Sequence, residues 1–302
     1  MKGLVPSPQA QELLDELRRD LAERLDENTD PRAVYEQAMS DFPAPEGAEL
    51  ERIEIDGIPA LRITAAGAGE TTGVLYMHGG GFGVGSAESN QDLLARLGHA
   101  AGVTVVGIDY RLLPEGRFPR ALEETLSAYR SVLQTGEGAP VIAGSSAGGG
   151  LALAASVALR EAGDALPAGL LLMSPWVDLT VSAPSLNEAS DGDWLGRETL
   201  VVAAETYLDG REPTDPLASP LHADLSGLPP MLIQVGGSEI LLDDARRLAD
   251  AARHAGTTAE LDVWPGMFHN FQLFASRLDE PAAALERAGT WVRERLAADQ
   301  AA

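Results

Sequence analysis

Residues 140–162 read PVIAGSSAGGGLALAASVALREA, and this stretch decides the fold of the chain. It begins with a short apolar run at 140–143 that predicts a strand, and it continues into 147–162, which predicts a helix. Between them, residues 144–148 match the pattern G-x-S-x-G. In a strand–turn–helix setting this pattern is typical of a tight turn that holds a serine hydroxyl at the carboxyl edge of a sheet. We therefore predict Ser146 as a nucleophile, with a plain glycine-rich turn as the alternative.

Strands and helices alternate on both sides of this stretch. Besides 140–143, short apolar runs predict strands at 73–77, 103–108, 169–173, 231–235 and 260–264. Helical patterns lie between or after them, at 88–101, 119–135, 147–162, 242–255 and 281–298. Period-two alternation over 49–64, around Asp56-Gly57, predicts a β-hairpin. Because alternating strands and helices form parallel sheets with right-handed crossovers, we predict an α/β fold with an eight-stranded, mostly parallel sheet flanked by helices.

One long interval, between 173 and 231, interrupts this alternation. It contains a helix-like segment at 197–209 and many prolines and acids. An interval of this length inside a compact α/β domain usually holds an inserted lid or cap. Further helices are predicted at 7–26 and after Asp30-Pro31. Because we find no internal repeat and no low-complexity linker, we predict a single domain over 1–302.

A second glycine-rich loop follows another predicted strand. His78-Gly79-Gly80-Gly81-Phe82 comes directly after 73–77. Glycines let the backbone approach a ligand closely, and their N–H groups can point at an anionic oxygen. A flexible loop and a nucleotide-binding loop are the alternatives, although the glycines never reach G-x-G-x-x-G spacing. Two glycine motifs that each follow a parallel strand are more specific together than either is alone.

A serine nucleophile needs a general base, and the chain contains five histidines. His269 follows the last predicted strand and therefore lies on the sheet edge that carries Ser146. The order nucleophile, acid, histidine along the chain is the one found with this type of turn. We predict His269 as the base, with a structural role as the alternative. The remaining histidines lie in the glycine loop, in predicted helices and in the long interval: His78, His99, His254 and His222.

The predicted acid follows the penultimate strand. Glu239 comes first after 231–235, where a loop can direct a carboxylate at His269. Asp243 and Asp244 are the alternatives, but both fit the start of the next helix, where acids stabilise the helix dipole. A carboxylate is needed at this place because it fixes the imidazole tautomer and stabilises the imidazolium.

With these residues placed, the chain from about residue 45 to its end resembles the bacterial hormone-sensitive lipase family (family IV) of esterases, which has the α/β-hydrolase fold. The resemblance rests on an ordered set of motifs: HGGGF at 78–82, DYRLLPE at 109–115, FPRALEE at 118–124, GSSAGGG at 144–150, SPWVDL at 174–179, SPL…GLPP at 219–230 and GMFHNF at 266–271. It implies a helical cap built from about 1–45 and an insert at about 180–215. It also implies an oxyanion hole made by the backbone N–H groups of Gly79, Gly80 and Ala147, and a supporting role for 110–115 beneath the glycine loop.

Two positions depart from the family pattern. Ser145 precedes the nucleophile where the family most often has Asp, and Glu239 stands where Asp is commoner. Family members that lack the first Asp often use Glu as the acid, so the two departures agree with each other. They leave the triad chemistry intact and leave the subgroup and the substrate open.

The resemblance implies a serine carboxylic ester hydrolase that acts on short- to medium-chain acyl esters through an acyl-enzyme. A lactone or amide hydrolase with the same triad is the alternative, and a non-catalytic ligand-binding protein of this fold is a more remote one. Phe82, Trp176 and Phe268 are candidate pocket residues, with core packing as an equal alternative. This chemistry requires no metal and no organic cofactor, and its partner is a small-molecule ester or lactone.

Composition narrows the remaining possibilities. The net charge of −24 argues against nucleic acids and anionic membranes as partners. Lys2 is the only lysine, which excludes Schiff-base catalysis and the P-loop, and the absence of cysteine excludes disulfides and thiolate chemistry. Residues 1–20 lack the apolar run of a signal peptide, and the uncharged stretch at 138–159 is explained by a strand, a turn and a buried helix. We expect a cytoplasmic protein, with a homodimer left open.

Overall fold

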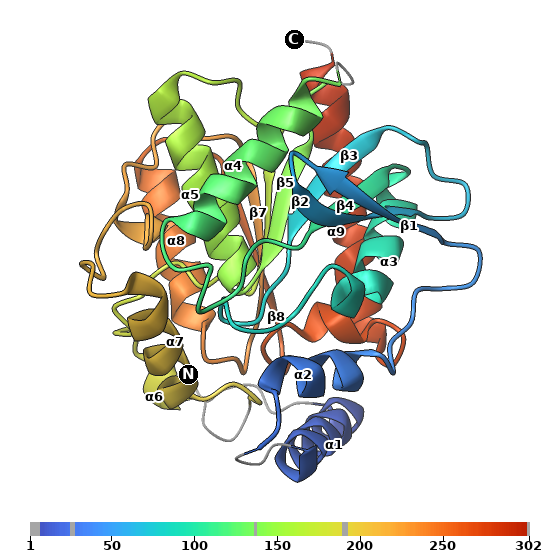
Figure 1. Cartoon of the computed structure of the whole chain (residues 1–302), viewed down its shortest axis with the longest axis vertical. Helices are drawn as coiled ribbons and strands as arrows, with labels where there is room; N and C mark the ends of the chain where they lie inside the picture. The colour runs from blue at the N-terminus through green and yellow to red at the C-terminus, as the bar shows by residue number, and fades with distance from the viewer. Residues whose placement is uncertain (1–6, 25–27, 136–137, 189–192, 301–302) are drawn as a thin grey trace.

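The computed structural model describes residues 7–24, 28–135, 138–188 and 193–300 (Figure 1). The strands are β1 Glu49–Ile55, β2 Ile58–Thr64, β3 Thr72–Met77, β4 Thr104–Ile108, β5 Val141–Ser145, β6 Leu170–Met173, β7 Met231–Gly236 and β8 Ala259–Trp264. The helices are α1 Pro8–Arg24, α2 Pro31–Met39, α3 Gln91–Ala101, α4 Arg120–Leu133, α5 Ala147–Ala162, α6 Ser185–Glu188, α7 Arg197–Leu208, α8 Leu242–His254 and α9 Asp279–Asp299. Short 3₁₀ helices are η1 Glu88–Asn90, η2 Pro220–His222 and η3 Phe271–Phe274. Residues 25–26 of the first predicted helix lie outside the described residues, as do residues 1–6 and 189–192 of the predicted cap.

All eight strands form one sheet in the order β1-β2-β4-β3-β5-β6-β7-β8. β2 runs antiparallel to both β1 and β4, and every other pair is parallel. The β1–β2 hairpin turns at Asp56 and Gly57, which both have positive φ angles (49° and 76°), as a tight hairpin turn requires. The predicted α/β-hydrolase fold with an eight-stranded, mostly parallel sheet is confirmed.

Helices cover both faces of the sheet, so the inner strands are buried on both sides. In β3, Leu75 and Met77 pack in the cluster that includes α4, α5 and α8, whereas Val74 and Tyr76 pack in the cluster that includes α3 and α9. Alternate side chains of a strand point to opposite faces, so an uninterrupted apolar run serves both layers. Figure 1 shows the two helix layers on either side of the sheet. Among the described residues, no helix is long and apolar enough to cross a membrane.

Helices from the N-terminus and from the long interval lie beside the loops that follow the parallel strands. Arg32 of α2 donates from Nε to the carbonyl oxygen of Gly83, 3.2 Å away, in the loop after β3. Tyr207 of α7 stacks on Phe82 of the same loop, with ring centroids 3.7 Å apart. In Figure 1, α1, α2, α6 and α7 all lie at the lower end of the view. Two segments that are far apart in the sequence therefore meet at one edge of the sheet.

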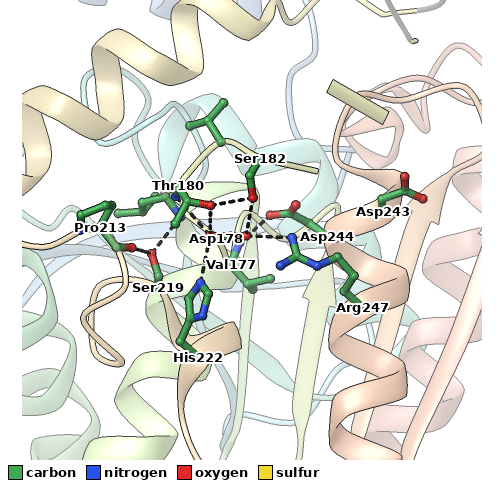
Figure 2. A network of polar contacts seen from close by, with 12 residues as sticks. Val177, Asp178, Thr180, Ser182, Pro213, Ser219, His222, Asp243, Asp244 and Arg247 are labelled. Carbon is green, nitrogen blue, oxygen red and sulfur yellow. Dashed lines mark hydrogen bonds and ion pairs between the residues drawn. The ribbon is translucent and has the colours of Figure 1, made fainter. Parts of the chain in front are cut away.

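A polar network around the buried carboxylate of Asp178 connects the segment after β6 to η2 and α8 (Figure 2). The Asp178 carboxylate accepts hydrogen bonds from Arg247 Nη1 at 2.7 Å and from Thr180 Oγ1 at 2.7 Å, and His222 Nε2 lies 3.1 Å from it. Asp244, also buried, accepts a hydrogen bond from the backbone N–H of Val177 at 3.3 Å. Burial raises the pKa of Asp178, but its hydrogen bonds lower that pKa by more. Burial and the nearby charge of Asp178 raise the pKa of Asp244 to about 7.

We expect Asp244→Asn to weaken the pH dependence of stability. The folded pKa of about 7 lies above the ordinary 3.8, so the contribution of Asp244 is full below about pH 4 and is lost as the pH rises through 7. Between these limits the wild type should lose up to about 4 kcal/mol of unfolding free energy relative to the variant. Urea unfolding at a series of pH values measures this difference. The same pH slope in both proteins would contradict the expectation.

Candidate active site

The turn between β5 and α5 holds Ser146 in a strained backbone conformation, with φ 51° and ψ −121°. A residue other than glycine rarely adopts a positive φ and needs support from its surroundings. The backbone N–H of Ser146 donates to the carbonyl oxygen of Met173, and its own carbonyl oxygen accepts from the N–H of Trp176, both at 2.9 Å. Gly148 packs so tightly under the turn that a Cβ there would lie 2.1 Å from the carbonyl oxygen of Met77. The turn is therefore fixed by strands on both sides of β5.

The structure brings Ser146, His269 and Glu239 together, as predicted from their order along the chain. His269, in the loop after β8, places Nε2 3.0 Å from Ser146 Oγ. Its Nδ1 lies 3.2 Å from Oε1 of Glu239, in the loop after β7. All three side chains are buried. This hydrogen-bonded chain can move the Ser146 proton to His269 while a carboxylate stabilises the resulting imidazolium.

The second carboxylate oxygen of Glu239 is held separately from His269. Oε2 accepts hydrogen bonds from Ser174 Oγ at 2.7 Å and from the backbone N–H of Gly236 at 2.6 Å. Ser174 Oγ also accepts from the backbone N–H of Asn270 at 3.2 Å, so one hydroxyl links the acid to the residue after the histidine. Ser174 opens the SPWVDL motif at 174–179, but sequence reasoning assigned it no role, because that role depends on contacts between loops.

The alternative acids and histidines have other surroundings. Asp243 and Asp244 lie in the first turn of α8, as expected, and accept hydrogen bonds from the backbone N–H groups of Ser185 and Val177. The ring of His78 stacks on Tyr110, with centroids 4.4 Å apart. The other histidines contact the backbone of Ala66, the carboxylate of Asp178 and the backbone of Asp250: these are His99, His222 and His254.

The glycine loop after β3 is held from below by the 110–115 segment. Tyr110 donates from its hydroxyl to the carbonyl oxygen of His78, and the N–H of Leu113 donates to the carbonyl oxygen of Phe82, both at 2.8 Å. Gly80 has φ +114°, and a Cβ there would lie 2.1 Å from the carbonyl oxygen of Val84. Only glycine fits this position.

The expected oxyanion-hole donors are the backbone N–H groups of Gly79 and Gly80, in the glycine loop, and of Ala147, in the turn after β5. None of them has a hydrogen-bond acceptor among the described residues. Ala147 is the first residue of α5, where the helix dipole also favours negative charge. Ser145, the residue that departs from the family pattern, places Oγ 2.8 Å from the Tyr76 hydroxyl. A Cβ on Gly79 would lie 3.0 Å from Ser145 Oγ, so the Ser145 side chain packs directly against the glycine loop.

The three candidate pocket aromatics do not share one environment. Phe82 lies in one cluster with Trp176, with centroids 5.8 Å apart, and stacks on Tyr207 of α7. Phe268 packs instead against Phe274, 5.5 Å away, in the cluster on the other face of the sheet. All three side chains are buried. Phe82, which stacks on α7, therefore packs with Trp176, whereas Phe268 lies in the other cluster.

A second buried carboxylate, Asp193, lies close to these residues and was also missed. It accepts hydrogen bonds from the backbone N–H groups of His269 at 3.0 Å and Ile240 at 2.8 Å. The acidic segment that contains it carries no recognisable motif, so no sequence signal identified it. In the part of the chain that the structure describes, no three His, Asp or Glu side chains are arranged to hold a metal ion.

We expect the His269 ring to titrate above 6.5. Burial lowers the pKa of His269, but the hydrogen bond and charge of Glu239 and the charge of Asp193 raise it by more. Glu239→Gln removes the largest of these opposing effects and should lower the pKa of His269. NMR titration of the ¹⁵N-labelled ring measures both values. A wild-type ring that titrates below 6.5, or an unchanged pKa in the variant, would contradict this electrostatic account.

Comparison with known proteins agrees with this geometry. A family model described as alpha/beta hydrolase fold matches residues 74–273. An acetyl-hydrolase of Streptomyces hygroscopicus is 46% identical over 223 residues, which cover 73% of this chain and 75% of that protein. An esterase of Acinetobacter venetianus is 36% identical over 259 residues, which cover 84% of this chain and 85% of that protein.

Solved structures give the same result over nearly the whole chain. The structure of an esterase from the bacterial hormone-sensitive lipase family has a TM-score of 0.93 and 40% sequence identity, covering 97% of this chain and 100% of that one. A hormone-sensitive lipase from a metagenome library has a TM-score of 0.90 and 38% identity, covering 97% and 99%. This chain belongs to the alpha/beta hydrolase fold family, among the bacterial hormone-sensitive lipase esterases.

Proposed function

We propose that this protein is a serine carboxylic ester hydrolase that acts on short- to medium-chain acyl esters. The observation that carries the proposal is the continuous hydrogen-bonded chain from Ser146 through His269 to Glu239. Relatives named esterase and acetyl-hydrolase support the reaction type, and the second name supports a small acyl group. A related esterase structure, 33% identical to this chain, was soaked with p-nitrophenyl butyrate, which suggests a suitable test substrate.

The reaction follows from the roles that we assign to these residues. His269 Nε2 takes the proton of Ser146 as Oγ attacks the ester carbonyl carbon, and a tetrahedral intermediate forms. The N–H groups of Gly79, Gly80 and Ala147 stabilise its oxyanion, since the described part of the chain offers them no competing acceptor. His269 then protonates the leaving alcohol, and the ester bond breaks to give the acyl-enzyme. Water, deprotonated by His269, releases the carboxylic acid and restores Ser146.

Glu239 acts on His269 rather than on the substrate. Its Oε1 holds the Nδ1–H tautomer, so that Nε2 is free to accept the Ser146 proton. The separate hydrogen bonds from Ser174 and Gly236 to Oε2 keep the carboxylate in place while His269 changes charge.

We also propose a cap on the single domain, formed by α1, α2 and an insert at about 180–215 that contains α6 and α7. Arg32 supports this arrangement because it binds the glycine loop from α2. The stacking of Tyr207 on Phe82 supports it from α7. Phe82 and Trp176 are then the better candidates for walls of the acyl pocket, and Phe268 the weaker one. Cytoplasmic location and a homodimer stay predictions that cell fractionation and analytical ultracentrifugation test.

Three variants test the triad with p-nitrophenyl acetate and butyrate. Ser146→Ala should reduce kcat/KM by about 10⁴-fold or more, and Glu239→Gln by about 10³–10⁴-fold, because both disable the same unit. Asp243→Asn, which removes the alternative acid, should stay near wild type. Undiminished activity in Ser146→Ala would end the proposal. Loss in Asp243→Asn but not in Glu239→Gln would overturn only the choice of acid.

Two alanine substitutions in one loop test the oxyanion hole. Gly80→Ala places a Cβ at φ +114° and 2.1 Å from the carbonyl oxygen of Val84. The loop must shift, and kcat should fall by about 10²–10³-fold, as when an oxyanion donor is lost. Gly83→Ala is the matched control, since the nearest atoms to its Cβ are 3.9 Å away. Equal kcat values for the two folded variants, checked by circular dichroism, would remove the loop from the mechanism.

A further inference from the structure

The carboxylate of Asp193 accepts three backbone hydrogen bonds from three different segments. Oδ1 accepts from the N–H of His269 at 3.0 Å and from that of Trp194 at 2.8 Å, and Oδ2 accepts from the N–H of Ile240 at 2.8 Å. The side chain is only 4% exposed. Ile240 directly follows Glu239, so one carboxylate joins the loop of the acid, the loop of the base and its own segment.

Asp193 holds the backbone of His269 and not its ring. The ring nitrogen Nδ1 lies against Glu239, 3.2 Å away, which leaves Asp193 no place in the proton transfer. The next residue, Trp194, binds the other backbone polar group of His269: its Nε1 donates to the carbonyl oxygen at 2.7 Å. Both backbone polar groups of the base are therefore bound by two consecutive residues of the insert.

The insert is in turn bound by the N-terminal helix. Arg18 of α1 donates from Nη2 to the carbonyl oxygen of Asp193 at 2.5 Å. A continuous path of hydrogen bonds thus leads from α1 through Asp193 to the backbone that carries Glu239 and His269. None of these contacts involves the substrate or the reacting atoms.

We propose that Asp193 is a positioning residue. Through it, the alignment of Glu239 and His269 depends on the insert being packed against the two triad loops. The proposal rests on the function proposed above. The chemistry of the side chain fits this role, because an ionised carboxylate only accepts hydrogen bonds and here meets three donors. Burial, together with the charge of Glu239, raises the pKa of Asp193 to about 6, so the side chain is ionised above that pH. An amide in its place would turn an N–H₂ group toward one of those donors. The loop that lost its acceptor would then be free to move relative to the other.

The charge of Asp193 also gives a signature that a purely structural residue lacks. The charged groups that act on the His269 ring are Glu239 and Asp193, and both raise its pKa. Removing the Asp193 charge should therefore lower the pKa of His269. The acidic limb of the kcat/KM profile, which follows deprotonation of the base, should move to lower pH.

The test compares Asp193→Asn with a matched variant, Asp243→Asn. Asp243 also ties the insert to the core, since Oδ2 accepts from the backbone N–H of Ser185 at 3.1 Å and Oδ1 accepts from Arg246 Nη1 at 3.1 Å. Unlike the Asp193 carboxylate, it accepts no bond from the backbone of His269 or Ile240 among the described residues. For p-nitrophenyl butyrate we expect Asp193→Asn to lower kcat by about 10–100-fold with little change in KM, equivalent to about 1.4–2.7 kcal/mol. Its acidic limb should shift to lower pH. Asp243→Asn should keep both the kcat and the limb of the wild type.

Trp194→Phe provides a second measurement if Asp193→Asn does not fold. It removes the bond from Nε1 to the His269 carbonyl and leaves all carboxylates in place. We expect kcat to fall by about 5-fold, typical of one hydrogen bond, with no shift of the acidic limb. A wild-type kcat in this variant would show that the insert does not position His269.

The outcomes separate this proposal from the proposed function. If Asp193→Asn matches Asp243→Asn in kcat and in pH profile while Ser146→Ala is inactive, the esterase assignment stands and the positioning role is wrong. If kcat falls equally in Asp193→Asn and Asp243→Asn, with no shift of the limb, the role of Asp193 is general support of the insert and the proposal is overturned. If Ser146→Ala keeps full activity, the proposed function itself has failed.

Discussion

The active site depends on the backbone of Ser146, which is held at φ 51° and ψ −121° between β5 and α5. Such a conformation persists only where the surroundings over-determine it. Here β5 lies between β3 and β6, and the carbonyl oxygens of Met77 and Met173 close on the turn from either side. The nucleophile is thus fixed by a fully buried inner strand and its two neighbours. Its partners come from loops and need other means of support.

Buried carboxylates supply much of that support. Glu239, Asp193, Asp178 and Asp244 are all nearly inaccessible to solvent, and each accepts a hydrogen bond from a segment distant in the sequence. A buried charge is tolerated only when it is paired or hydrogen-bonded, so these acids stay in place only while their donors do. The acidic residues behind the net charge of −24 therefore include four buried ones that hold loops together inside the molecule.

Sequence patterns predicted the fold because the predicted strands, turns and helices are all consistent with one topology. Apolar runs of strand length, a turn at Asp56-Gly57 and helices between the runs leave few topologies open. The positions of Ser146, Glu239 and His269 were predictable too, because parallel strands bring their carboxyl ends to one edge.

The contacts of Ser174 and Asp193 could not be predicted in this way. Both bind backbone N–H groups of loops that lie 47 or more residues away in the sequence. Every residue except proline has such an N–H group, so the identity of the donor residue does not predict these contacts. The different environments of Phe82 and Phe268 could not be predicted from the sequence either. They lie on opposite faces of the sheet, a difference set by the geometry of the loops that follow β3 and β8.

Arg32 joins α2 of the proposed cap to the glycine loop through the carbonyl oxygen of Gly83, and Arg18 joins α1 to the insert through the carbonyl oxygen of Asp193. Both acceptors are backbone carbonyl oxygens, which carry no titratable proton, so acidification removes no acceptor from either contact. The sensitivity of the site to acid therefore belongs to His269, which must be neutral to accept the Ser146 proton, and not to the two contacts of the cap.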